Sequence, residues 1–165
     1  MVKTILIDTR QQANKHKAKH EWFEKQGVAG IRCALPFGDY CKAPTVSVDT
    51  KRDLSELCNC LDAEHTRFRR ECQKAQDAGS QLIILTETVE VATLDDFALW
   101  QEADDDFYMR KAKYPNARRR YGKRFSEACR TMTARYGVRF EFCRPENAGQ
   151  RVLDLIFPDE SPGES

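Results

Sequence analysis

The sequence predicts an α/β fold, because segments typical of strands alternate with segments typical of helices. The chain has 165 residues, which fits one domain, and a hydrophobic content of 41 % with nine Phe is enough for a core. Residues 82–87 (LIILTE) form a short apolar run, typical of a central strand that is buried on both faces. We expect residues 1–157 to form a single domain and 158–165 a disordered tail.

In the first half of the chain, apolar runs and period-2 patterns predict strands at 2–8, 31–35 and 45–51. A further short strand is expected to begin in the Pro- and Gly-containing segment 36–40 (PFGDY). Helical spacing predicts helices at 15–26, at 53–61 and at 64–78, the first and last of which end at glycines. His16 and His20, on the lysine-rich first helix, are expected to face solvent.

In the second half, we expect a short helix over 94–100, beginning after Thr93, and a longer one that starts near Phe125 and ends at Gly137. VRFEFC (138–143) alternates as a strand, and apolar spacing from Val152 to Ile156 marks a last helix. Between the helix at 94–100 and the helix that starts near Phe125, residues 101–124 lack apolar periodicity. We therefore expect this segment to be a mobile or extended excursion.

The net charge of +1 conceals two blocks of opposite sign. Residues 86–106 hold eight acids and no base, whereas residues 108–144 hold twelve bases and two acids. A basic block of this kind favours binding to a polyanion, although solvated helix faces would give the same count. The candidate phosphate-binding residues, which are interleaved with Tyr114 and Tyr121, are Arg118, Arg119, Arg120, Lys123 and Arg124.

Several classes of protein are excluded or disfavoured by the composition. No run approaches the ~20 apolar residues of a membrane span, and the N-terminus has no signal-peptide layout. The seven cysteines are an odd number without C-x-x-C spacing, which favours reduced thiols. We therefore expect a cytoplasmic protein.

The chemistry is carried by residues 38–51. On a strand over 45–51, Asp49 and Lys51 lie on the same face, and Asp39 reaches the same place if the flanking segments pair as a hairpin. Two carboxylates with the backbone carbonyl of Thr50 make an oxygen site suited to Mg²⁺. Lys51 would orient a water molecule or neutralise developing charge. An ordinary surface strand that carries an ion pair is the alternative.

Several flanking motifs in the first hundred residues resemble the XPF/Mus-type structure-specific nuclease domain, a branch of the PD-(D/E)xK restriction-endonuclease-like fold. That family has V-D-x-R-E, then L-x-x-G-D-Y, then E-R-K-x-x-x-D, followed by R-F and a core strand. The matches, in chain order, are 7–10 (IDTR), 35–40 (LPFGDY), 48–51 (VDTK), 67–68 (RF) and 82–87 (LIILTE).

The resemblance implies a mixed β-sheet flanked by helices and a Mg²⁺-dependent DNA endonuclease, with Mn²⁺ as a substitute metal, acting on branched or recombination and repair DNA. It implies that Asp39, Asp49 and Asp8 bind the metal and that Lys51 positions the nucleophile. It implies that Arg10 and Arg67 steady phosphate or the acidic cluster, and it adds Glu56 as a further supporting residue.

The sequence departs from the family pattern in three respects. Gln11 replaces a glutamate, and Asp49-Thr50-Lys51 replaces E-R-K. The trailing acid of E-R-K-x-x-x-D has no exact match, although Glu56 fits if one residue is inserted. No tandem helix-hairpin-helix module is expected. The chain resembles small stand-alone versions of the domain from phages and bacteria, so we expect it in the cytoplasm of a bacterial or phage-infected cell. The resemblance also implies a homodimer or a partner protein that targets the enzyme to DNA. The alternatives are a catalytically inactive module that binds DNA or a partner, and a restriction-like or exonucleolytic enzyme.

Overall fold

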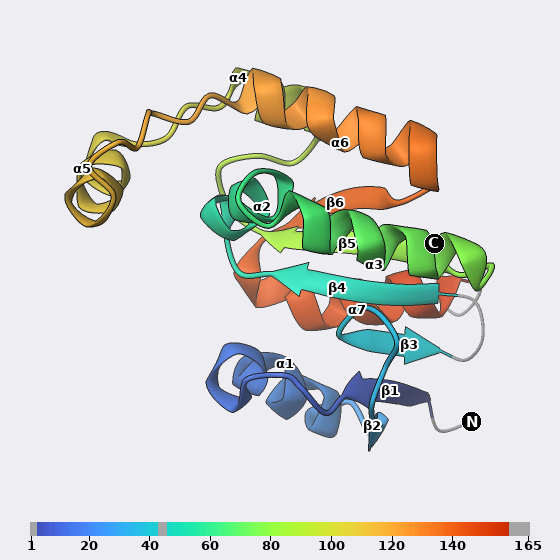
Figure 1. Cartoon of the computed structure of the whole chain (residues 1–165). Helices are drawn as coiled ribbons and strands as arrows, with labels where there is room; N and C mark the ends of the chain where they lie inside the picture. The colour runs from blue at the N-terminus through green and yellow to red at the C-terminus, as the bar shows by residue number, and fades with distance from the viewer. Residues whose placement is uncertain (1–2, 43–45, 159–165) are drawn as a thin grey trace.

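The computed structural model describes residues 3–42 and 46–158, so the predicted tail lies, except for Pro158, outside the described residues. These residues form one six-stranded mixed sheet in the order β2-β1-β3-β4-β5-β6 (Figure 1). The strands are β1 (Thr4–Asp8), β2 (Ala29–Cys33), β3 (Tyr40–Lys42), β4 (Val46–Lys51), β5 (Gln81–Glu87) and β6 (Arg139–Cys143). Only the pairs β1–β3 and β3–β4 are antiparallel. The predicted mixed α/β sheet is confirmed.

Helices cover both faces of this sheet. They are α1 (Ala13–Lys25), α2 (Leu54–Leu61), α3 (His65–Asp77), α4 (Leu94–Leu99), α5 (Asp104–Lys113), α6 (Gly122–Tyr136), the 3-10 turn η1 (Pro145–Asn147) and α7 (Ala148–Ile156). In β5, Leu82 and Ile84 pack into the core under α2, α3, α4 and α6, whereas Ile83 and Leu85 pack into the core under α1 and α7. The strand is therefore central and buried on both faces, as predicted.

The sharp connection from β4 to α2 carries the chain across the end of the sheet. β4 ends at Lys51, and Asp53 caps α2 by accepting a hydrogen bond at Oδ1 from the Glu56 backbone N–H, at 2.7 Å. Because only two residues separate strand and helix, the first turn of α2 lies directly beside the end of β4. This connection places Glu56 next to Lys51.

The inner face of α1 is polar, which corrects the expectation that His16 faces solvent. His16 is 1 % exposed and shares a 2.9 Å hydrogen bond with the Tyr40 hydroxyl. Lys19, also buried, forms a 2.9 Å ion pair with Glu87 at the end of β5. Burial, followed by the nearby Lys19 and Lys15 charges, lowers the pKa of His16 to about 3, so the ring is neutral. Apolar periodicity could not identify this face, because its buried residues are mostly polar.

The excursion predicted over 101–124 contains helix α5, so the expectation of an extended segment is wrong for residues 104–113. None of the ten α5 residues, all of which are described, is buried. Three aspartates stand in its first turn, and Arg110, Lys111 and Lys113 stand in its last, which suits the helix dipole. Figure 1 shows α5 standing clear of the rest of the molecule. The mobility expected of the segment stays a prediction.

None of the helices in the described part of the chain is long and apolar enough to cross a membrane.

Candidate active site

The β3–β4 hairpin brings Asp39 beside Asp49, as the sequence predicted. Tyr40 pairs with Val48, and the Asp39 backbone N–H donates to the Val48 carbonyl at 2.9 Å. The Asp39 carbonyl accepts a 2.9 Å hydrogen bond from the backbone N–H of Asp8. The backbone of Asp39 is therefore fixed between β1 and β4, and its carboxylate position follows from the sheet.

Gly38 is required at this turn for two independent reasons. Its φ is +73°, in the left-handed region that favours glycine. A Cβ atom at this position would also lie 2.2 Å from the Ser47 Oγ, inside any allowed contact distance. The Gly38 N–H donates to the Glu71 Oε1 at 2.8 Å, so the turn also fixes a third carboxylate.

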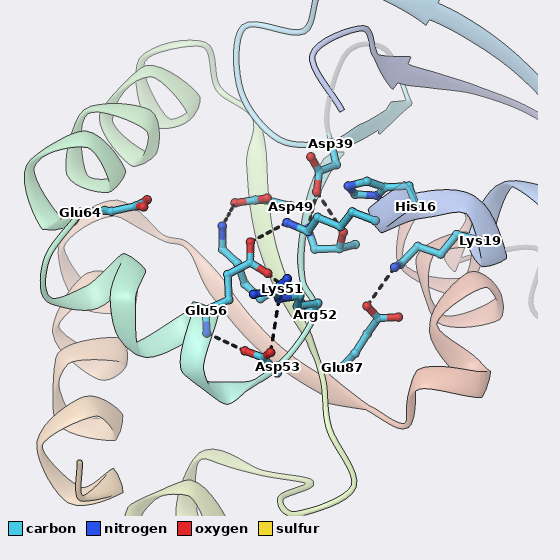
Figure 2. A network of polar contacts seen from close by, with 12 residues as sticks. His16, Lys19, Asp39, Asp49, Lys51, Arg52, Asp53, Glu56, Glu64 and Glu87 are labelled. Carbon is cyan, nitrogen blue, oxygen red and sulfur yellow. Dashed lines mark hydrogen bonds and ion pairs between the residues drawn. The ribbon is translucent and has the colours of Figure 1, made fainter. Parts of the chain in front are cut away.

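Asp39 and Asp49 have different hydrogen-bond partners. Asp39 Oδ2 accepts from the Thr50 backbone N–H at 2.8 Å and from the Thr50 hydroxyl at 2.9 Å. Asp49 Oδ2 accepts from Lys51 Nζ at 2.8 Å, which confirms that Asp49 and Lys51 share a face of β4. Figure 2 shows Asp39, Asp49, Lys51 and Glu56 gathered between α1 and α2.

The charges of these groups are interdependent. Burial, and then repulsion by Asp49, raises the pKa of Asp39 to about 7. Burial would also raise the pKa of Asp49, but the Lys51 ammonium outweighs it, so the pKa of Asp49 lies below its ordinary value. Burial would lower the pKa of Lys51, but Asp49 outweighs that effect and raises it. Lys51 is therefore a cation at neutral pH rather than a base.

A cleft of about 800 Å³ opens over these residues. The residues predicted for the site that line it are Asp8, Arg10, Asp39, Asp49, Lys51, Glu56 and Arg67. Thr50 is fully buried and is not among the described residues that line the cleft; its N–H and hydroxyl orient Asp39 from behind. A metal contact from the Thr50 carbonyl stays a prediction.

Asp8 and Arg10 connect the end of β1 to the wall of the cleft. Asp8 accepts from the Leu35 N–H at 3.1 Å and from Arg10 Nε at 3.0 Å. Arg10 also donates to the Leu35 carbonyl. The Asp8 carboxylate is therefore engaged in holding the chain segment that leads to Asp39, a role that fits indirect rather than direct support of a cation.

Glu56 and Arg67 lie on the α2 and α3 sides of the cleft. Glu56 Oε1 accepts from Lys15 Nζ at 2.5 Å, and Oε2 accepts from the Arg52 N–H at 2.9 Å. Burial would raise the pKa of Glu56, but its hydrogen bond from Lys15 outweighs it and lowers the pKa. Arg67 is exposed and pairs with Glu64 in the first turn of α3.

Several residues that line the cleft were not predicted to belong to the site, among them Lys15, Glu71 and Gln11, which the sequence marked only as a departure from the family pattern. Gln11 Nε2 donates to the Asp39 carbonyl at 2.7 Å. Burial, and then the Asp49 charge, raises the pKa of Glu71. Helical spacing gave one usable signal, because Glu71 follows Arg67 by four residues and so lies on the same side of α3.

Asp39 and Asp49 fit a divalent metal by their chemistry. They are two close carboxylates whose repulsion a cation would relieve, and Mg²⁺ binds proteins through one or two carboxylates, retaining water and substrate phosphate. Among the described residues, no group of three or more His, Cys, Asp or Glu side chains is arranged to hold a metal. The two aspartates are therefore the residues that would hold a cation here, and metal binding stays a prediction.

The basic residues predicted to bind DNA divide into two groups. Arg119 forms a 2.5 Å ion pair with Asp104, and the Arg120 guanidinium donates to Ser55 and Asn59 of α2. Arg118 and Lys123 are exposed, as is Arg124, which pairs with Asp62 at 2.8 Å. Phosphate binding by all five stays a prediction, but Arg119 and Arg120 already have structural contacts.

A second basic surface lines the cleft itself, and of its residues the sequence had predicted only Arg67 for the site. Arg67, Arg70 and Lys74 project from α3 at helical spacing and border the cleft that contains Asp49 and Lys51. A row of cations beside an acidic centre is suited to binding a polyanion.

No family model matches the chain, and no curated protein matches it in sequence. Solved structures do match. The structure of XPF from Aeropyrum pernix is 17 % identical over 97 % of this chain and 63 % of that one, with a TM-score of 0.63. XPF from the same organism in complex with DNA is 16 % identical over 99 % of this chain and 68 % of that one, with a TM-score of 0.64. The chain thus spans about two thirds of those proteins, and it has the XPF-type fold that its motifs predicted.

Proposed function

We propose that the protein is a Mg²⁺-dependent endonuclease that cleaves branched DNA at the Asp39–Asp49 cleft. The observation that carries the proposal is the convergence of two acids and a buried lysine at the bottom of a cleft rimmed by cations. The XPF-type fold supports it, and one solved structure with this fold is a complex with DNA. Mn²⁺ is expected to substitute for Mg²⁺.

Each residue has a distinct task in this proposal. Asp39 and Asp49 would hold Mg²⁺, which when bound would stabilise charge on a phosphoryl oxygen and acidify a water molecule. Lys51 Nζ, 2.8 Å from Asp49, would stay protonated and offset negative charge that develops at the phosphate. Gln11 and Thr50 would keep Asp39 in place through its carbonyl and its carboxylate.

The substrate backbone would run along the α3 side of the cleft. Arg67, Arg70 and Lys74 would each approach a phosphate, so that DNA affinity falls with rising salt. Replacement of Arg70 and Lys74 by Ala should reduce the slope of log K against log salt by about 2, roughly one for each lost contact.

A cleavage panel tests the function. End-labelled fork, flap, four-way junction and linear duplex substrates are incubated with the protein in Mg²⁺, in Mn²⁺ and in chelator. The proposal is supported in full if a branched form is cleaved faster than the linear duplex and cleavage requires the metal. Metal-dependent cleavage of every form at the same rate supports nuclease activity but refutes a preference for branched DNA. Gel filtration with light scattering tests the homodimer that the sequence resemblance implies.

A catalytically inactive DNA-binding module is the second candidate. It is favoured by Gln11, which stands where the resembling family has an acid, and by the absence of a three-residue metal group among the described side chains. The same panel separates the two, because this candidate binds branched DNA with no cleavage in either metal.

A further inference from the structure

Residues 100–122 form an arm with a paired stem and helix α5 at its tip. Gln101 and Tyr121 make an antiparallel bridge, the Gly122 N–H donates to the Trp100 carbonyl at 2.7 Å, and the Glu102 N–H donates to the Arg120 carbonyl at 3.0 Å. These hydrogen bonds pair the two ends of the arm with each other.

The buried Glu102 clamps the helix to this stem. Its carboxylate accepts from Arg110 Nε at 2.8 Å, from Arg110 Nη2 at 2.7 Å and from the Arg120 N–H at 3.0 Å. The Arg119 guanidinium lies 4.8 Å from the centre of the Phe107 ring. Because charge-assisted, two-pronged contacts fix orientation as well as distance, α5 is held in one direction relative to the stem.

The stem is also tied to the cleft. Arg120 Nη1 donates to the Ser55 hydroxyl at 3.0 Å, and Arg120 donates to Asn59 as well. Ser55 and Asn59 both line the cleft that contains Asp49. Figure 1 shows the arm leaving the molecule at the end where β4 and β5 terminate, which is the end that carries Lys51.

The arm exposes aromatic rings next to cations. Tyr108 is 63 % exposed, Tyr114 is 56 % exposed and Tyr121 is 55 % exposed. Lys113 Nζ lies 5.3 Å from the centre of the Tyr114 ring, and Lys111 is exposed on the same helix. Rings that stack on bases, with cations that contact phosphates, are the elements that bind single-stranded nucleic acid.

We infer that the arm binds a single strand of the DNA substrate as it leaves the cleft, with Tyr108 and Tyr114 stacking on unpaired bases. This inference rests on the proposed function and deepens it, because it assigns the branched or tailed part of the substrate to a particular surface. The cleft holds duplex backbone, and the arm holds the strand that is not paired.

Binding is measured by fluorescence anisotropy in chelator, with a blunt duplex and with the same duplex carrying a single-stranded oligo(dT) tail. We expect Tyr108→Ala/Tyr114→Ala to weaken binding of the tailed DNA by about tenfold or more and to leave blunt-duplex binding unchanged. Tyr108→Phe/Tyr114→Phe should bind like the wild type, because stacking needs the ring and not the hydroxyl. Val89→Ala, which shortens a 65 % exposed apolar side chain outside the arm, is the matched control.

The outcomes separate the two proposals. If Arg70→Ala/Lys74→Ala weakens both DNAs while the tyrosine variants change neither, the arm inference is wrong and the proposed function stands. The arm inference is supported if the wild type binds the tailed DNA more tightly than the blunt duplex and Tyr108→Ala/Tyr114→Ala alone loses that preference. If the wild type binds neither DNA, both proposals are overturned.

Discussion

Replacement of Glu102 by Ala should melt the arm without unfolding the protein. The substitution removes three hydrogen bonds to a carboxylate that is 4 % exposed, two of them from the Arg110 guanidinium. Breaking a buried pair of this kind costs about 3–5 kcal/mol. A ten-residue helix that buries no side chain has no other large source of stability, because short isolated helices are marginal in water.

Hydrogen exchange measures the effect segment by segment. A loss of about 3–5 kcal/mol in the local opening free energy should speed exchange of the α5 amides by about 10²–10⁴-fold. The amides of β5 should exchange at the wild-type rate, since the core does not touch α5. Asp105→Ala, which removes an exposed carboxylate from the first turn of the same helix, is the control and should have a small effect. Equal α5 protection in Glu102→Ala and the wild type would refute the clamp.

Three further substitutions test the geometry around the acids. Asp39→Asn should raise the melting temperature in chelator at pH 8 more than at pH 5. Because the pKa of Asp39 is raised to about 7 in the folded protein, folding favours the protonated acid, and the stability of the wild type falls as pH rises from 3.8 towards 7. Asparagine resembles the protonated acid and avoids this loss. Gln11→Glu should weaken Mg²⁺ binding in calorimetry or leave it unimproved, since the new carboxylate cannot donate to the Asp39 carbonyl as Nε2 does now; tighter binding would contradict this role. Gly38→Ala should destabilise the protein in urea by more than Gly79→Ala, because both have positive φ but only at Gly38 would the added Cβ meet Ser47.

Local sequence patterns predicted the sheet and the acidic centre well. The spacing of Asp49 and Lys51 needed only the period of a strand, and the position of Asp39 needed only a hairpin. The strand at residues 82–87 was identifiable because a run of apolar residues too short for a helix leaves few alternatives. These features depend on residues close together in the sequence, and the pairing of the strands then fixes their positions relative to one another.

The features that were missed depend on polar contacts between distant segments. The buried face of α1 relies on His16 with Tyr40 and Lys19 with Glu87, which apolar spacing cannot report. Helix α5 forms without a buried side chain, stabilised by its terminal charges and by Glu102. Glu71 reaches the cleft because the Gly38 turn binds it, a contact between residues 33 positions apart.

We propose that Asp39, Asp49 and Lys51 together form a metal-dependent phosphodiesterase site. The most direct test is the single-turnover cleavage rate of Asp49→Ala in Mg²⁺ on the best substrate, with DNA affinity measured in parallel and Glu146→Ala, an exposed site on η1, as the control. We expect a rate at least about 10²-fold below the wild type, with folding and DNA binding retained, because the substitution removes both a proposed metal ligand and the partner of Lys51. Cleavage by Asp49→Ala at the wild-type rate would contradict it.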